Sequence, residues 1–377
     1  MSRDKRAIEK INRVSDSIHF RDTGSFPIQD IYFWDEFLAN WRKYFGLSAG
    51  TDIFKYYDLD IVCCSPNIDP VIDNVVEIEK TPGYVIYKGG FGSILKMDFT
   101  QPVPCFIDFA VKEISGLEKF AFEDPGDKRR YERNFAPVDM YNFCNSFYEQ
   151  LNFYKDSFFI LGNICEARET AWRVIGMQNE LIALKEYPEK LRMFADRAAD
   201  FNIEIGSIQL SNEYIDGLII YGDVAYGRGL LMSPGSWKEI YFPALEKICA
   251  ELKRFGKPLF YHTDGNYLEI LDILAGIGID AIHPNEAKSG IDVVKLKEHY
   301  QGKIAFMGNI DALKALSQSM NDIEQEIAYK MLAVRLGGYL PGGDDIPPTV
   351  SPENYDYYIS LLKKKRKSQE KKSNAGT

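Results

Sequence analysis

Short apolar runs alternate with longer amphipathic stretches in the second half of the chain. The amphipathic stretches lie at about 179–201, 236–255, 267–277, 291–299 and 312–334, and their periodicity predicts helices. The apolar runs predict buried strands at 158–161, 217–221, 258–261, 279–282, 304–307 and 337–340. Strands that alternate with helices form parallel sheets with right-handed crossovers. No Gly-x-Gly-x-x-Gly string follows the first strand, which argues against a dinucleotide-binding sheet and favours a barrel.

The first 150 residues follow a different pattern, and we expect them to form an extension that packs on the barrel. Aromatic residues crowd the segment 25–60, which predicts core packing or a lid. At about 82–96, two apolar runs flank Lys88-Gly89-Gly90, a pattern typical of a β-hairpin. Residues 151–362 then form the main part of the barrel, and 363–377 are expected to be a basic flexible tail. The predicted fold class is α/β, a (β/α)8 TIM barrel with an N-terminal helical and β-hairpin extension.

Composition narrows the class of protein without naming an activity. The chain has 377 residues, of which 45% are hydrophobic and 14% aromatic, values that indicate a large globular core. A net charge of −10 disfavours nucleic acid and anionic membranes as partners. The N-terminus has no apolar signal-peptide core, and no window approaches eighteen apolar residues. With six scattered cysteines that suggest reduced thiols, these features predict a cytoplasmic protein.

Polar residues follow five of the predicted strands at the point where each strand ends. The ends are Gly222-Asp223, His262-Thr263-Asp264-Gly265-Asn266, His283-Pro284-Asn285-Glu286, Gly308-Asn309-Ile310-Asp311 and Gly342-Gly343-Asp344-Asp345. A single aspartate in such a place is often a helix N-cap, and Asp311 is expected to be one. Five ends of this kind are better explained by a shared site, because strand ends converge on one face of a barrel.

His262 is the most informative of these residues. A carboxylate follows it two positions later, so His262 and Asp264 form a candidate metal half-site with Asp344 as a third ligand, for which zinc is the candidate ion. The alternative is a histidine that hydrogen-bonds substrate or neighbours without any metal. Asp223 is the candidate general acid or substrate-orienting group, so the catalytic set is Asp223, His262, Asp264 and Asp344. The candidate substrate-binding residues are Tyr226, Arg228, Asn266 and Asn309.

These stretches resemble the uroporphyrinogen decarboxylase superfamily in order and spacing, over roughly 155–362. The matching strings are Gly222-Asp223-Val224-Ala225-Tyr226, Leu231-Met232-Ser233-Pro234, Tyr241-Phe242-Pro243, His262-Thr263-Asp264-Gly265-Asn266, Gly278-Ile279-Asp280-Ala281-Ile282-His283-Pro284, Met307-Gly308-Asn309-Ile310-Asp311 and Gly337-Gly338-Tyr339-Leu340. The resemblance implies a (β/α)8 barrel and either of two chemistries. One is removal of carboxylates from a tetrapyrrole; the other moves methyl groups between small molecules, corrinoid proteins and thiols or folate.

Departures from the superfamily pattern distinguish these chemistries. The Arg-Gln-Ala-Gly-Arg string that marks true decarboxylases is absent, and a polycarboxylate would lack cationic partners. Zinc-using methyltransferases carry His-x-Cys and a later Cys, whereas Asp264 and Asp344 stand at those positions here. The resemblance therefore implies a demethylase-type methyltransferase that acts on a methoxylated or methylated small substrate.

Three hypotheses follow for the function. The leading one is the methyltransferase component of a corrinoid-linked demethylation system, with a small-molecule substrate, a corrinoid protein as partner and a candidate homodimer. The first alternative is a uroporphyrinogen decarboxylase-type lyase in porphyrin metabolism. The second is a non-catalytic small-molecule binding protein on the same fold, since a fold alone does not fix a function.

Overall fold

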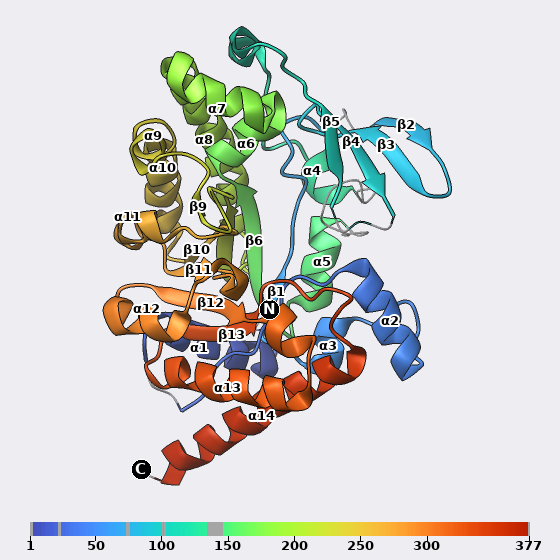
Figure 1. Cartoon of the computed structure of the whole chain (residues 1–377), viewed down its shortest axis with the longest axis vertical. Helices are drawn as coiled ribbons and strands as arrows, with labels where there is room; N and C mark the ends of the chain where they lie inside the picture. The colour runs from blue at the N-terminus through green and yellow to red at the C-terminus, as the bar shows by residue number, and fades with distance from the viewer. Residues whose placement is uncertain are drawn as a thin grey trace.

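A curled, seven-stranded parallel sheet forms the centre of the molecule (Figure 1). The computed structural model describes residues 3–21, 24–72, 76–99, 101, 103–133 and 146–375, with side chains as far as residue 371. The strand order is β1-β6-β7-β10-β11-β12-β13. The strands are β1 (Ile61–Cys63), β6 (Phe159–Cys165), β7 (Gly217–Tyr221), β10 (Leu259–His262), β11 (Ala281–His283), β12 (Ala305–Ile310) and β13 (Tyr339–Gly343). The strands predicted in the second half are thereby confirmed, and all are parallel.

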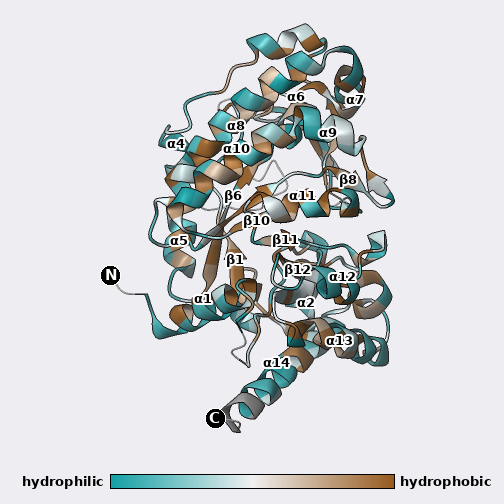
Figure 2. Ribbon diagram, turned by 90° about the vertical axis from the view of Figure 1, so that its left-hand side faces the viewer, coloured by the Kyte–Doolittle hydropathy of each residue, from teal (hydrophilic) through white to brown (hydrophobic). Residues whose placement is uncertain are grey.

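Helices surround this sheet, and α1 (Lys5–Ile18) differs from the helices of its outer face because it packs against the inner face (Figures 1 and 2). Those before β6 are α1, α2 (Asp35–Phe45), α3 (Ile53–Tyr57), η1 (Ile114–Lys119), α4 (Arg129–Glu132) and α5 (Phe147–Tyr154). Those between β6 and β11 are α6 (Ala167–Ile175), α7 (Met177–Glu186), α8 (Pro188–Leu210), α9 (Pro234–Ile240), α10 (Phe242–Leu252), η2 (Lys253–Phe255), η3 (Leu268–Ile270) and α11 (Leu271–Gly276). The last are η4 (Ala287–Ser289), α12 (Val293–Tyr300), η5 (Ala312–Leu316), α13 (Met320–Arg335) and α14 (Pro352–Ala375). None of the helices in the described ranges is long and apolar enough to cross a membrane.

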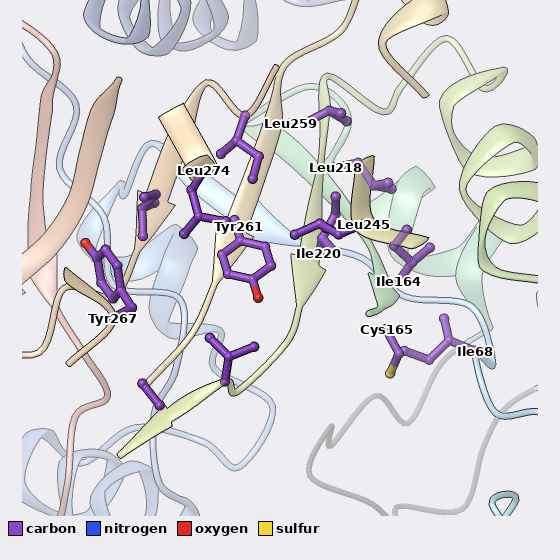
Figure 3. Packing of buried hydrophobic residues seen from close by; sticks show 14 of the residues in the cluster. Ile68, Ile164, Cys165, Leu218, Ile220, Leu245, Leu259, Tyr261, Tyr267 and Leu274 are labelled. Carbon is purple, nitrogen blue, oxygen red and sulfur yellow. The ribbon is translucent and has the colours of Figure 1, made fainter. Parts of the chain in front are cut away.

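Two apolar clusters lie on opposite faces of the sheet. The inner cluster takes alternate residues of the seven strands, such as Phe159, Ile219 and Met307, and adds Val14 and Ile18 from α1. The outer cluster packs the intervening residues against the helices, as Figure 3 shows for Leu218, Ile220 and Tyr261. Because both faces of each strand are buried, the strands read as continuous apolar runs in the sequence.

An extended segment lies between the two edge strands of the sheet. The amide of Gln29 donates to the carbonyl of Pro341 in β13, and the amide of Asp60, next to β1, donates to the carbonyl of Ile28. Ile31 from the same segment joins the inner cluster. The segment therefore occupies the gap between β13 and β1, although it is not itself a regular strand. A complete eight-stranded barrel remains a prediction.

The N-terminal half carries a second, antiparallel sheet. Its strands are β2 (Val76–Lys80), β3 (Tyr84–Lys88), β4 (Ile94–Asp98) and β5 (Cys105–Asp108), which stand beside the parallel sheet in Figure 1. β3 and β4 pair at the place of the predicted hairpin, and Gly92 adopts a φ of 76° in the turn between them. A further short pair, β8 (Ala225–Tyr226) and β9 (Gly229–Leu230), follows β7.

The predicted flexible C-terminal tail is wrong for the described residues. Helix α14 continues through Ala375, and Arg366 on it forms an ion pair with Asp60, with 2.7 Å between Nη1 and Oδ2. Asp60 is fully buried and also binds Arg13 of α1 and the amide of Ile28. The prediction of a flexible tail rested on the many lysines of this segment and did not identify the ion pair between Arg366 and the buried Asp60.

Arg366→Ala should lower the free energy of unfolding by about 2 kcal/mol, because Asp60 then loses one of two cationic partners in a buried setting. Lys367→Ala, at an exposed position next to it, is the matched control and should change stability little. Urea unfolding measures both variants. Equal stability of the two would restore the prediction of a flexible tail.

Candidate functional site

Asp223, His262 and Asp264 meet where β7 and β10 end. His262 is the last residue of β10 and pairs in register with Tyr221 of β7, which places Asp223 just beyond. His262 Nε2 lies 3.7 Å from Asp223 Oδ1 and 3.6 Å from Asp264 Oδ1. The backbone amide of Asp264 also donates to Asp223 Oδ1, at 3.0 Å. The predicted proximity of His262 and Asp264 is thus present in the structure, and Asp223 joins them.

Gly265 allows the loop after His262 to turn this tightly. Its φ is 76°, and a Cβ atom there would lie 2.5 Å from the backbone nitrogen of Tyr226. Only glycine fits both conditions without moving the β8–β9 pair. The glycine therefore fixes where Asp264 stands relative to His262.

A second histidine supports the first from the neighbouring strand. His283 at the end of β11 is fully buried, and its Nδ1 lies 2.9 Å from Nδ1 of His262. Burial, and then the proximity of His262, lower the pKa of His283 well below its ordinary value, so it is neutral. One of the two Nδ1 atoms must then donate to the other. If His262 donates, its Nε2 presents a lone pair; if it accepts, its Nε2 carries the proton towards the carboxylates.

A second acidic group adjoins the first and shares Asp264 with it. Carboxylate oxygens of Asp264, Glu286 and Asp344 lie within 4.8 Å of one another. Lys288 sits among them, with its Nζ 2.6 Å from Glu286 Oε1 and 3.1 Å from Asp344 Oδ2. An ammonium group therefore already neutralises part of this group, whereas the Asp223–His262–Asp264 group has no Lys or Arg ion pair among the described residues.

The crowded carboxylates shift the pKa values of one another. Burial, and then repulsion from Asp223 and Glu286, raise the pKa of Asp264 to about 8. Burial and the nearby Glu169 raise the pKa of Asp223. The side chains of Asp223 and Asp264 are nevertheless 40% and 48% exposed, as expected for groups that reach solvent from within a recess. At neutral pH the group therefore holds at least one dissociable proton on Asp264, in contact with water.

A layer of buried charge behind this site was missed by the sequence reading. Glu166 follows β6 directly, is fully buried, and accepts a hydrogen bond from the hydroxyl of Tyr261 at 2.7 Å. Burial raises the pKa of Glu166 to about 7. On α6, Arg168 pairs with Glu180 at 2.9 Å and also donates to the carbonyl of Asp223. The signal was the string Glu166-Ala167-Arg168-Glu169 at the end of an apolar run, the same pattern that identified the other strand ends.

The N-terminal segment completes the site from the other side. The ring of Tyr32 lies 6.0 Å from those of both His262 and His283, and its hydroxyl bonds to that of Tyr221. Two residues later, the indole of Trp34 donates to Asp345. Trp34 and Asp345 line a cavity of about 260 Å³ that also reaches Lys288 and Asp344.

The four predicted substrate-binding residues divide into two kinds. Tyr226 and Arg228 lie on the exposed β8–β9 pair, with Tyr226 half exposed. Asn266 gives its side-chain amide to the carbonyl of Ser289 at 3.1 Å. Asn309 is buried, and its side-chain oxygen accepts hydrogen bonds from the amide of Val293 and from Lys330 Nζ. Its side-chain amide donates to two backbone carbonyls. These contacts favour structural roles for the two asparagines; substrate binding by any of the four stays a prediction.

A divalent ion fits the group of Asp223, His262 and Asp264 better than the ligand set predicted from the sequence. His262, Asp264 and Asp344 were the predicted ligands, but no candidate group in the described ranges contains both His262 and Asp344. Asp223, His262 and Asp264 offer one nitrogen and two carboxylates within 4.8 Å, a donor set suited to zinc. Asp264 Oδ1 is buried and has no hydrogen-bond partner, so a donor atom is unused there.

Comparisons with known proteins agree with this architecture. A family model described as uroporphyrinogen decarboxylase (URO-D) matches residues 154–365. A search of curated proteins finds no match. Among solved structures, a methyltransferase from Methanosarcina mazei is similar with a TM-score of 0.63 and 15% identity, over 94% of this chain and 98% of the other. At that identity the likeness shows the fold alone. A β-glucosidase mutant derived from a hyperthermophilic tetrameric structure covers 97% of this chain and 93% of its own at 12% identity, with a TM-score of 0.42 too low to support an argument.

Glu166→Gln should make stability less dependent on pH. In the wild type, the raised pKa of Glu166 means that the folded state holds a proton that the unfolded state releases between about pH 4.5 and 7. Wild-type stability therefore falls as pH rises through that window, by about 1–3 kcal/mol, and the variant lacks this loss. Urea midpoints at pH 5 and pH 8 give the difference, with the exposed Glu246→Gln as control. Parallel pH curves for Glu166→Gln and wild type would contradict the assignment.

Zinc binding should depend on the group Asp223–His262–Asp264 and not on Asp344 of the neighbouring group. His262→Ala is expected to weaken Zn²⁺ binding by about tenfold or more, because it removes the only nitrogen ligand of that group. Asp344→Asn should leave the affinity close to that of wild type. Equilibrium dialysis with metal analysis measures both; a larger loss in Asp344→Asn would return the site to the ligand set predicted from sequence.

Proposed function

The chain belongs to the uroporphyrinogen decarboxylase family, and from this premise we propose that it is a methyltransferase that demethylates a small methylated substrate. A corrinoid on a partner protein is the proposed methyl acceptor. The carrying observation is the contact of His262 with Asp223 and Asp264 at the strand ends. The neighbour from Methanosarcina mazei, itself described as a methyltransferase, is consistent with this proposal.

The charge of the site argues against a tetrapyrrole polycarboxylate as substrate. Three cations around the site are already paired: Arg168 with Glu180, Arg173 with Glu169, and Lys288 with Glu286 and Asp344. Arg228, in the exposed turn between β8 and β9, is a cation without an ion pair among the described residues. An anionic substrate needs unpaired arginines or lysines, and here it would meet carboxylates instead. A small neutral or cationic substrate suits this site better than a porphyrin precursor.

We assign to Asp264 the role of proton donor to the departing heteroatom. When a methyl group leaves an oxygen, the remaining alkoxide or phenoxide must take up a proton. Asp264 has a pKa of about 8 and therefore holds that proton at neutral pH, next to His262. Asp223, held by the amide of Asp264, orients the imidazole of His262. Arg168 fixes the backbone of Asp223 and acts as a positioning residue.

A divalent ion, where present, would be held by His262, Asp223 and Asp264. It would supply Lewis-acid stabilisation of the leaving heteroatom. Its binding requires the tautomer in which His262 donates from Nδ1 to His283, because Nε2 must then present a lone pair. Homodimerisation and a cytoplasmic location complete the proposal.

His262→Ala and Asp264→Asn should each lower the rate of methyl transfer by about 10²–10³-fold, within the usual range for loss of a general acid–base group. The assay follows formation of methylcorrinoid from a panel of methoxylated and N-methylated compounds, with a corrinoid protein as acceptor. Glu246→Gln, at an exposed position on α10, is the control and should leave the rate unchanged.

The same preparation is offered uroporphyrinogen without any corrinoid. Carboxylate loss there, together with no methyl transfer from any compound of the panel, would replace the methyltransferase by the lyase. Full methyl-transfer activity in both variants would remove His262 and Asp264 from the proposed mechanism. Binding of small molecules with no turnover in either assay would leave the non-catalytic alternative.

A further inference from the structure

The cavity beside Trp34 has walls of a distinctive kind. Its volume is about 260 Å³, just below the usual range for small-molecule sites of about 300–1,000 Å³. Ile310, Leu313, Pro347 and Pro348 supply apolar walls, and Trp34 adds an aromatic one. The cavity therefore has room for one compact group with apolar parts that can contact these walls.

The charges that line this cavity are mostly negative. Asp311, Asp344 and Asp345 face it, against one cation, Lys288. Lys288 is ion-paired with Glu286 and Asp344, and Asp311 caps the amides of Leu313 and Lys314. Asp345 remains as the carboxylate beside the aromatic wall, with the indole of Trp34 as its hydrogen-bond donor. An anion would be repelled here.

Trp34 and Asp345 are held in place by paired backbone segments. The amide of Trp34 donates to the carbonyl of Ile346 at 3.1 Å, and the amide of Ile346 donates to the carbonyl of Tyr32 at 3.0 Å. Phe33 and Ile346 form a parallel bridge between the same segments. The aromatic ring and the carboxylate are therefore positioned before any ligand arrives, which reduces the entropy cost of binding.

A metal ion is a poor occupant of this end of the cavity. Asp345 belongs to neither group of converging ligand atoms in the described ranges, and Trp34, Pro347 and Pro348 line the cavity together with it. A divalent ion needs several oxygen or nitrogen ligands at once. An alkylated ammonium ion does not need several coordinating atoms. An aromatic face and apolar side chains contact its alkyl groups, and one carboxylate balances its charge.

We propose that this cavity binds a small alkylated ammonium ion through Trp34 and Asp345, and that the substrate of the protein carries such an ammonium group. The assignment of the ammonium compound as substrate rests on the proposed function, whereas its binding does not. It narrows the substrate from methylated small molecules in general to those that carry a fixed or protonated amine. The cavity shares Lys288 and Asp344 with the acidic group at Asp264, so a ligand held there lies beside the site.

A matched pair of probes tests the charge requirement. Choline and its carbon isostere 3,3-dimethylbutan-1-ol have the same shape and differ by one positive charge. Calorimetric titration of the full chain, without corrinoid protein, is expected to give choline an affinity at least about tenfold higher. Equal affinities, or binding of neither probe, would overturn the proposal.

Two variants locate the binding. Asp345→Asn should weaken choline by about tenfold and leave the isostere unchanged, and Trp34→Leu should weaken choline while Trp34→Phe retains part of the affinity. Glu246→Gln, an exposed charge on α10, controls for net charge, and circular dichroism checks that each variant is folded. Unchanged choline affinity in both Asp345→Asn and Trp34→Leu would refute the site.

Turnover is measured separately so that the two proposals can fail independently. Choline binding with these variant effects, but no methyl transfer from any compound, would uphold the ammonium site and refute the methyltransferase. Methyl transfer from neutral methoxylated compounds, without choline binding, would do the reverse.

Discussion

The packing of alternate side chains inside the curled sheet is the constraint on which the rest of the structure depends. Seven strands contribute to one inner cluster, and α1 adds Val14 and Ile18 to it. A parallel strand with both faces buried has little freedom of register, because a shift of one residue would exchange inner and outer side chains. The strand ends are therefore fixed in space, and with them His262 and His283 and the starting points of the loops that carry Asp223 and Asp344.

Electrostatics then shapes what this fixed frame presents. Carboxylates gather at the strand ends, and Arg168, Arg173 and Lys288 are already paired within the protein. Behind them, Glu166 and the pair Arg168–Glu180 are buried without access to solvent. Removing one partner of such a pair is costly, so the layer holds the loop at Asp223 rigidly. The accessible carboxylates are left to take up protons or a positive ligand.

The sequence predicted well wherever the signal was local and periodic. Strands β7, β10, β11, β12 and β13 lie close to their predicted positions, because each is a buried run followed by polar residues. Helix boundaries were less accurate: the single helix expected at 179–201 is two, broken between Glu186 and Pro188, where the proline lacks an amide to continue the first helix. His262 and Asp264 were expected to lie together and do so, since both stand at the end of β10, and Asp223 joins them from the end of the adjacent strand β7.

Long-range contacts account for what the sequence did not reveal. The extended segment at Ile28–Ile31 has no strand-like alternation, and its place between β13 and β1 depends on partners more than 300 residues away in one case. The roles of Trp34 and Asp345 depend on the same seam. Asp344 was expected to be a third metal ligand, but its carboxylate forms an ion pair with Lys288. Such a pairing between residues far apart in the chain leaves no local pattern in the sequence.

The anchoring of both chain ends on Asp60 has a consequence for how the protein is made. Arg13 lies near the beginning of the chain and Arg366 near its end, and both bind the same buried carboxylate. During synthesis, the first helix, the segment at Ile28 and β1 emerge from the ribosome more than 300 residues before Arg366 does. Their charge and edge hydrogen bonds stay incomplete for that time, at a typical rate of about 5–20 residues per second. The seam can therefore close only after β13 and α14 have been synthesised.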